Sequence, residues 1–212
     1  SSEQVVYAAI SASVEDESDN AISATSTTFT AADSDAPSAS LAYTVSGSSV
    51  SSVNNGDVVR ITATFNETIV DSPVMQISGS GVSTLNATNM TRSSTTSYYY
   101  DWTVGSGDGT KTFSLATGTD AAGNVITGTP TSGASITVDN TGPALSSSVP
   151  ADNATGVLAN ANVILTFSEA ATVNTGNIYL KKTSDNSTVE TIDITSGQVS
   201  GSGSTTITIN PG

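Results

Sequence analysis

A short pattern occurs twice in this chain, about a hundred residues apart, and it constrains the fold more than any other feature. Asp33-Ser-Asp-Ala-Pro37 precedes a strand-like segment that ends in Thr64-Phe-Asn-Glu67, and Asp139-Asn-Thr-Gly-Pro143 precedes one that ends in Thr166-Phe-Ser-Glu169. The two prolines lie 106 residues apart, and the two Thr-Phe motifs lie 102 residues apart. One structural unit of the size of a small β-sandwich therefore repeats along the chain. Tandem copies of such a domain typically build length rather than a catalytic cleft.

Alternating apolar and polar residues predict β-strands in the first copy. Every second residue of 59–65 is apolar, ending at Phe65, and the residues between them are polar, which is the period of a half-buried strand. Residues 98–104 alternate in the same way, and the glycine-rich segment 105–109 is typical of a hairpin turn. The sequence contains no helical periodicity longer than two turns. We therefore expect an all-β fold.

The repeat divides the chain into three parts. Residues 37–139 form the one complete copy. Residues 143–212 form a second copy, which we expect to be incomplete at its C-terminus because it holds no equivalent of the first copy's closing strand. Residues 1–34 contain two strand-like stretches, 5–10 and 22–32, and are an N-terminal strand segment or the end of a preceding repeat. An open sandwich exposes sheet edges, so either the chain is a piece of a longer protein or a neighbouring copy supplies the missing strand.

Composition argues against several classes of protein. Nineteen acidic residues against five basic ones give a formal charge of −14, so we expect no binding to nucleic acid or to anionic membrane surfaces. The chain has no cysteine and no histidine, which removes disulfides, thiolate-bound metals, the usual catalytic triads and zinc hydrolase sites. No apolar run approaches the about 20 residues that cross a bilayer as a helix. We expect neither an enzyme nor a membrane-inserted protein.

Four short sequence motifs are similar to motifs in the repeats of one bacterial family. They are Asp120-Ala-Ala-Gly-Asn124, Val138-Asp-Asn-Thr-Gly-Pro143, Pro150-Ala-Asp-Asn-Ala-Thr-Gly156 and Leu165-Thr-Phe-Ser-Glu169. They resemble the bacterial Ig-like repeats of S-layer proteins and large surface adhesins, and the resemblance covers residues 37–212. It implies tandem immunoglobulin-like β-sandwiches in an elongated arrangement, located outside the cell at its surface.

The same resemblance implies a function and partners. Repeats of this kind serve as structural segments of an S-layer, a filament or a surface adhesin. Their partners are then copies of the same chain or adjacent repeats, together with a surface glycan or a protein receptor in the case of an adhesin. Joints between such sandwiches are often stiffened by calcium.

Acidic and amide side chains recur at the expected joints and at strand ends that should face them. Calcium takes six to eight oxygen ligands, and several loops at one joint can supply them. The alternative is that these residues only make turns, because Asp and Asn side chains hydrogen-bond the local backbone. The candidate calcium ligands are Asp33, Asp35, Glu67, Asp120, Asn124, Asp139, Asn140, Asp152 and Glu169.

Two other functions compete with a structural role. A carbohydrate-binding module would present Tyr99 and Trp102 on one exposed face, but alternation places Trp102 with Tyr98, Tyr100 and Val104, which favours a position in the core. The chain could also be a spacer module of a secreted enzyme. Within the structural interpretation, we expect Phe65 and Phe167 to be equivalent core residues of two homologous sandwiches.

Overall fold

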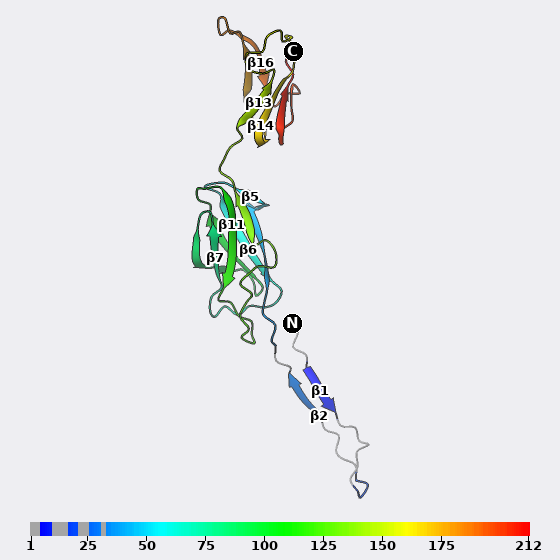
Figure 1. The fold of residues 1–212 in the computed structure, drawn as a ribbon. Helices are drawn as coiled ribbons and strands as arrows, with labels where there is room; N and C mark the ends of the chain where they lie inside the picture. The colour runs from blue at the N-terminus through cyan, green and yellow to red at the C-terminus, as the bar shows by residue number, and fades with distance from the viewer. Residues whose placement is uncertain (1–4, 10–16, 21–25, 31–32) are drawn as a thin grey trace. The chain divides into compact units, whose positions relative to one another are not determined.

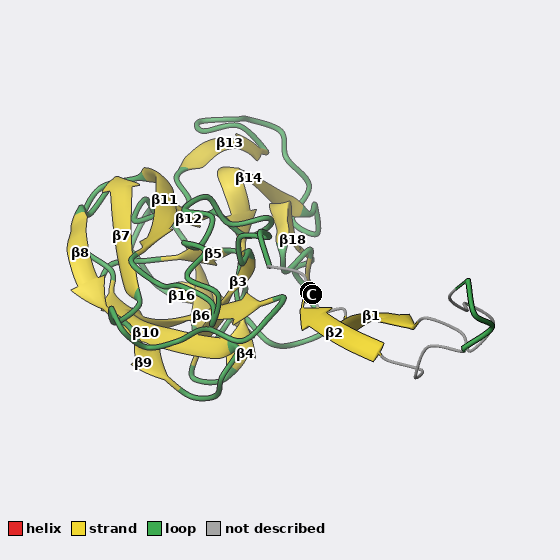
Figure 2. Ribbon diagram, turned by 90° about the horizontal axis from the view of Figure 1, so that it is seen from below, coloured by secondary structure: helices red, strands yellow, loops and turns green. Residues whose placement is uncertain are grey.

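The computed structural model describes residues 5–9, 17–20, 26–30 and 33–212, and all regular secondary structure in this part of the chain is β-strand (Figure 2). The expected all-β fold is therefore confirmed.

The chain divides into two compact units, residues 1–140 and 141–212. No helix long and apolar enough to span a membrane occurs among the described residues. In chain order the strands are β1 (Val5–Ala9), β2 (Ser26–Thr30), β3 (Ala39–Val45), β4 (Ser48–Ser49), β5 (Ser52–Val53), β6 (Val58–Phe65), β7 (Gln76–Gly81), β8 (Leu85–Asn89), β9 (Thr91–Arg92), β10 (Ser97–Thr103), β11 (Gly109–Ala116), β12 (Ser135–Val138), β13 (Leu145–Val149), β14 (Val163–Ala171), β15 (Asn177–Lys181), β16 (Thr188–Asp193), β17 (Val199–Ser200) and β18 (Ser204–Ile209).

The first unit contains a sandwich of two five-stranded sheets. One sheet has the order β4-β3-β6-β10-β9 and the other has the order β5-β12-β11-β7-β8. Figure 1 shows β6 in one layer and β11 with β7 in the other. β5 pairs with β12 in parallel, and the other pairs are antiparallel. These are immunoglobulin-like sandwich features: two packed sheets within about 100 residues.

The core of this sandwich lies between the inward faces of the two sheets. On β6 the apolar residues of the alternating segment, including Ile61 and Phe65, are buried, as the sequence pattern predicts. Phe65 meets Tyr98 edge-on, with ring centroids 6.1 Å apart. Trp102 meets Phe113 edge-on at 5.5 Å across the two sheets. Such aromatic contacts add to the stabilisation from buried apolar area.

The second unit repeats the first in its strand pairing. Its larger sheet has the order β13-β14-β18-β17, which matches β3-β6-β10-β9. Leu145 lies opposite Phe167 in this sheet, as Ala39 lies opposite Phe65 in the first unit. Leu145 follows Ala39 by 106 residues, and Phe167 follows Phe65 by 102 residues. These are the offsets between the two copies of the repeated sequence motifs. The smaller sheet is β15-β16, which corresponds to β7-β8.

The expected equivalence of the two phenylalanines holds for strand position but not for burial. Phe65 is 5% exposed, whereas Phe167 is only half-buried. The expectation that both are core residues is therefore wrong for Phe167. The physical reason is that β15-β16 offers two strands where the first sandwich packs five against its β6 sheet.

The N-terminal segment contains one hairpin. β1 pairs antiparallel with β2, and Val5 lies opposite Thr30. The strand-like stretches expected at 5–10 and 22–32 are confirmed only over β1 and β2, since Ile10 and residues 22–25 and 31–32 lie outside the described residues.

Candidate metal site

Three segments far apart in the sequence meet at one end of the first sandwich. They are the stretch before β3, the end of β6 and the turn after β11. The backbone N–H of Asn66 donates to the carbonyl of Ser38 at 3.0 Å, and the N–H of Ser38 donates to Oδ1 of Asn66 at 2.8 Å. The N–H of Thr127 donates to the carbonyl of Pro37 at 2.7 Å. These bonds hold Asp33, Glu67 and Asp120 in neighbouring loops.

The three acidic side chains form a compact group. One carboxylate oxygen from each of Asp33, Glu67 and Asp120 lies within 4.8 Å of the other two. Asp120 is buried with 5% exposure, and Asp33 and Glu67 are half-buried. The Oε1 atom of Glu67 is shielded from solvent. Three carboxylates thus converge in a partly dehydrated environment, where like charges repel one another more strongly than they would in water.

Asn124 holds Asp120 in place and links it to the segment that carries Asp33. The backbone N–H of Asn124 donates to Oδ1 of Asp120 at 2.8 Å, and its side-chain Nδ2 donates to Oδ2 at 2.8 Å. The same Nδ2 donates to the backbone carbonyl of Asp33 at 3.1 Å. Asn124 is therefore a supporting residue whose amide nitrogen faces the carboxylate.

These hydrogen bonds determine the ionisation of Asp120. Burial raises the pKa of its carboxyl group, but hydrogen bonds from the Asn124 side chain and from the backbone N–H groups of Asn124, Ala122 and Gly123 lower it. The net effect is a pKa below the ordinary value of an aspartate. Asp120 is consequently a carboxylate at neutral pH, which is the form that binds a cation.

The geometry suits a hard divalent cation. Calcium lies 2.3–2.6 Å from its oxygen ligands, so two oxygens on the same ion are separated by at most about 5 Å. The 4.8 Å limit on the three carboxylate oxygens falls within that range. Three carboxylates leave three to five positions for carbonyl oxygens or water. The residues fit calcium in donor type and spacing.

The other predicted ligands lie elsewhere. Asp35 is exposed, and its N–H donates to Oδ1 of Asp33 at 3.1 Å. Asp139 and Asn140 lie at the opposite end of the first sandwich, where Asp139 N–H donates to the Val53 carbonyl at 2.9 Å.

Asn140 joins the start of the linker to the turn between β10 and β11 at that opposite end. Its N–H donates to Asp108 Oδ1 at 2.5 Å and its Nδ2 donates to the Gly107 carbonyl at 2.7 Å. Asp152 is exposed and Glu169 is half-buried in the second unit. Among the described residues, neither takes part in a group of three converging carboxylates.

The arrangement of β10 contradicts the exposed face of Tyr99 and Trp102 that a carbohydrate-binding module would present. Trp102 is 3% exposed and packs on Phe113, while Tyr99 lies on the other face of the strand under the guanidinium of Arg60, 4.2 Å from its ring centroid. Tyr99 and Trp102 therefore do not share an exposed face. The alternation of residues 98–104 correctly predicts Tyr98, Trp102 and the following Val104 in the core. Tyr100, which the same pattern places with them, is only half-buried and packs against that core.

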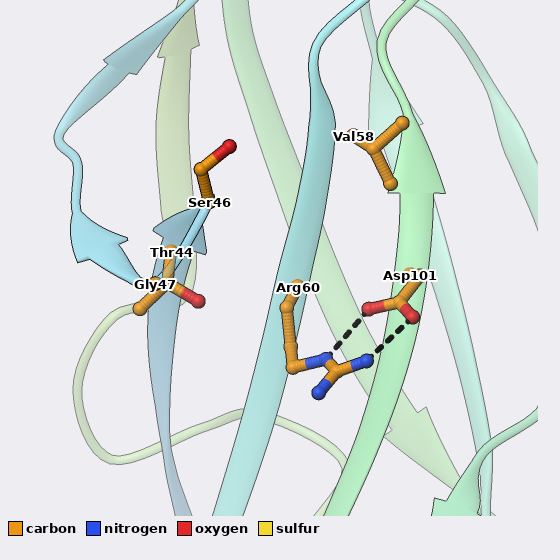
Figure 3. Close-up of a pocket in the computed structure, with 6 residues that line it drawn as sticks. All are labelled: Thr44, Ser46, Gly47, Val58, Arg60 and Asp101. Atoms are coloured by element: carbon orange, nitrogen blue, oxygen red, sulfur yellow. Dashed lines mark hydrogen bonds and ion pairs between the residues drawn. The ribbon is translucent and has the colours of Figure 1, made fainter.

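A shallow surface pocket lies on the outer face of the β3-β6-β10 sheet (Figure 3). Arg60 and Asp101 face one another across β6 and β10, joined by two bonds of 2.8 Å. This pairing raises the pKa of Arg60 and lowers that of Asp101. Because Asp101 and Tyr99 already engage the guanidinium, the pocket offers little charge for binding a ligand.

Sequence reasoning missed one buried charged residue. Lys111 is fully buried on β11, where its Nζ donates to the Ser83 carbonyl at 2.7 Å and lies 5.7 and 5.6 Å from the ring centroids of Trp102 and Phe113. The signal was present, because Lys111 alternates with Phe113 and Leu115 in the sequence. Burial lowers its pKa.

Fold and comparison agree on the class of protein. The chain is an all-β protein built from Ig-like β-sandwiches. Residues 139–212 match the family model of the bacterial Ig-like domain. The comparisons with curated proteins and with solved structures gave no match.

Proposed function

We propose that this chain is an extracellular structural repeat protein, a segment of a bacterial S-layer, filament or surface adhesin, with no enzymatic role. The match of residues 139–212 to a bacterial Ig-like domain supports this function, as does the repetition of strand pairing between the two units. The acidic composition, with a formal charge of −14, suits a soluble surface module. Its partners are adjacent repeats or copies of itself, and, in an adhesin, a surface glycan or protein receptor.

Calcium is the metal that we assign to this role. One observation carries the assignment: three of the nine predicted ligands, Asp33, Glu67 and Asp120, come from distant segments and place carboxylate oxygens within 4.8 Å of one another. Bound calcium would neutralise their mutual repulsion. It would also fasten the segment at Asp33, which leads into the sandwich, to the β6 and β11 loops. Such a fixed joint would stiffen a module that transmits tension along a filament or surface layer.

The equivalent joint at residues 139–143 remains a prediction. Asp139 and Glu169 occupy the repeat positions of Asp33 and Glu67. We expect calcium there when a carboxylate equivalent to Asp120 completes the group.

Thermal unfolding with and without calcium tests the site. A ligand that binds only the folded state adds about 2.7 kcal/mol at a hundred times its dissociation constant, and calcium modules outside the cell bind at about 0.1–1 mM. We expect calcium at about 10 mM to raise the melting temperature of the first unit, and a chelator to reverse the rise. Glu67→Gln should abolish the response, whereas Asp152→Asn, an equal charge change at an exposed carboxylate, should retain it. Equal responses of the two variants would refute the site.

Electron microscopy tests the architectural role separately. Purified chain should form fibres or sheets, and a chain that stays dispersed at every calcium concentration would contradict a filament or S-layer function. The calcium titration measures thermal stability and not assembly. A negative result for the calcium site therefore does not decide the architectural role, and a negative result in microscopy does not decide the calcium site.

A further inference from the structure

Three neighbouring strands of the first sandwich supply the polar side chains of the surface pocket. Arg60 of β6 lies directly opposite Asp101 of β10 on one side and directly opposite Thr44 of β3 on the other. Directly opposed residues of antiparallel strands share one face of the sheet. That face is the outer one, because the alternate residues of β6, such as Ile61, are buried in the core. Thr44, Arg60 and Asp101 therefore form one polar row across the sheet (Figure 3).

The turn between β3 and β4 forms another wall of the pocket. Ser46 and Gly47 have positive φ values of 49° and 83°, the pattern of a two-residue type I′ turn that joins two paired strands. Both residues line the pocket together with Val58, which is 55% exposed. Because the side chains at the turn are short and Arg60 beside them is long, a hollow of about 320 Å³ remains. This volume lies at the lower end of the about 300–1,000 Å³ range of small-molecule sites.

The pocket has spare hydrogen-bonding capacity. Nε and Nη2 of Arg60 each donate to one carboxylate oxygen of Asp101 at 2.8 Å, which uses two of the five N–H donors of the guanidinium. The third nitrogen points away from Asp101 (Figure 3). Each carboxylate oxygen can accept a second hydrogen bond, and Thr44 and Ser46 add one hydroxyl group each.

The charges in and around the pocket favour a neutral ligand. The guanidinium of Arg60 and the carboxylate of Asp101 offset one another, and the formal charge of −14 on the chain repels anions. A cation would be repelled by the guanidinium, because Asp101 is already paired with it. The ligand that suits the pocket is therefore polar and uncharged.

The position of the pocket argues against an extended peptide. Peptides that add to a sheet bind through main-chain hydrogen bonds at an unpaired strand edge. β6 instead lies inside its sheet and pairs with β3 on one side and β10 on the other. A ligand at this place must bind through side chains, and a sugar ring offers several hydroxyl groups to them together with an apolar C–H face.

We propose that the pocket binds a neutral hexose ring of a glycan. Two neighbouring hydroxyl groups of the ring would bond to the spare positions of Arg60 and Asp101, and a third would bond to the hydroxyl of Thr44. The C–H face of the ring would contact Val58. This inference rests on the proposed function only in naming a surface glycan as the partner.

Tyr99 prepares Arg60 for this role. The guanidinium lies 4.2 Å from the ring centroid of Tyr99 and is held on its other side by Asp101. Ordering a long side chain on binding costs affinity, and a side chain that is already held in place reduces that cost. The site is thus largely formed before the ligand arrives.

NMR titration of the full-length chain tests the site. The probes are four neutral disaccharides, built from glucose, galactose, mannose and N-acetylglucosamine, added with a chelator present so that the calcium site does not contribute. A single ring of about 12 non-hydrogen atoms binding at an ordinary ligand efficiency gives a dissociation constant of about 1–10 mM. At least one probe should shift the backbone amide signals of residues 44–47, 58–60 and 101 in a saturable way. No saturable shift from any of the four at about 50 mM, well above that range, would overturn the proposal.

Two variants and a matched control assign the binding to the pocket. Thr44→Val keeps the shape of the side chain, removes the hydroxyl and should weaken binding about two- to tenfold. Arg60→Met removes a charged donor and should weaken it more than about tenfold; because exposed ion pairs contribute little to stability, this variant should remain folded. The control is Thr112→Val, the same substitution at an exposed position of β11 in the other sheet, which should leave binding unchanged. Equal binding by Thr44→Val and Thr112→Val would overturn the assignment.

Two further probes test the class of ligand. Glucuronic acid should bind more weakly than glucose, because its carboxylate meets an acidic chain and a paired arginine. Tighter binding of glucuronic acid would overturn the assignment to a neutral sugar. A serine- and glycine-rich peptide that shifts the same amides at a lower concentration than any disaccharide would identify a peptide site instead. Fibres in microscopy without sugar binding would remove the pocket and retain the architectural role, whereas sugar binding by a dispersed chain would support the pocket and contradict the filament.

Discussion

The side-chain amide of Asn124 donates a hydrogen bond of 2.8 Å to the carboxylate of Asp120. The backbone N–H of Asn124 donates to the same carboxylate at 2.8 Å, so one residue supports both oxygens. The Asp120 pKa is lower in the folded chain than its ordinary value, despite the opposing effect of burial. Protonation of Asp120 is therefore linked to unfolding.

We predict that this linkage appears as loss of stability in acid. A group whose pKa is lowered by folding stabilises the folded state above its unfolded-state pKa, which is about 3.9 for aspartate. That contribution is lost as the pH falls through the lower, folded-state value. Asn124→Ala should lower the urea midpoint at pH 7 and reduce this acid-dependent loss, measured with chelator present.

The control for this prediction is Asn86→Ala. Asn86 is exposed on β8, and we expect its substitution to change stability by less than about 0.5 kcal/mol. If Asn124→Ala and Asn86→Ala show the same midpoint and the same pH profile, Asn124 does not support Asp120.

The site could be predicted in part from the sequence. Repetition of Asp33 and Glu67 as Asp139 and Glu169 drew attention to strand ends and joints, and the carboxylates of Asp33 and Glu67 do converge with that of Asp120. It could not separate Asp33 from Asp35, which lies in the same turn. The distinction depends on hydrogen bonds between distant segments, such as those joining Ser38 and Asn66, and no local pattern specifies these.

A second prediction concerns the buried Lys111. Burial lowers its pKa, so between the folded and unfolded values the unfolded chain binds more protons. Stability should therefore rise with pH through that window, up to about pH 10.4. Lys111→Met should be at least as stable as the natural chain at pH 7 and should lack this rise, as measured by urea unfolding at pH 7 and pH 10.

The exposed Lys182 provides the comparison for Lys111. Lys182→Met should retain the pH profile of the natural chain. Marked destabilisation by Lys111→Met at both pH values would mean that the bond to Ser83 and the contacts with Trp102 and Phe113 outweigh the cost of burying the ammonium.

A third prediction compares two buried tyrosines. The hydroxyl oxygen of Tyr98 is shielded from solvent and has no hydrogen-bond partner among the described residues. The Tyr43 hydroxyl donates to the carbonyl of Gly133. Tyr98→Phe should be neutral or stabilising by up to about 1 kcal/mol, whereas Tyr43→Phe should cost about 1 kcal/mol. Urea unfolding followed by Trp102 fluorescence measures both, and a larger loss for Tyr98→Phe would contradict the difference in partners.

The fold was more accessible to sequence reasoning than the burial of its residues. Period-two alternation located β6 and β10 correctly because each has one face on the core. The same logic placed Phe167 in the core, where it is only half-buried. Alternation reports which face of a strand is apolar, but the number of strands packed against that face is a property of the whole sandwich.

The last prediction uses this difference between Phe65 and Phe167. Replacing a buried phenylalanine by alanine costs about 3–5 kcal/mol, and we expect that loss for Phe65→Ala. Phe167→Ala should cost about half as much in dilute solution, since its side chain removes less apolar area from water. Hydrogen exchange resolved by peptide measures each strand separately, through protection of β6 and β14. Equal costs for the two variants would mean that Phe167 is as buried as Phe65 in solution, and that the apolar face of β14 is not partly uncovered.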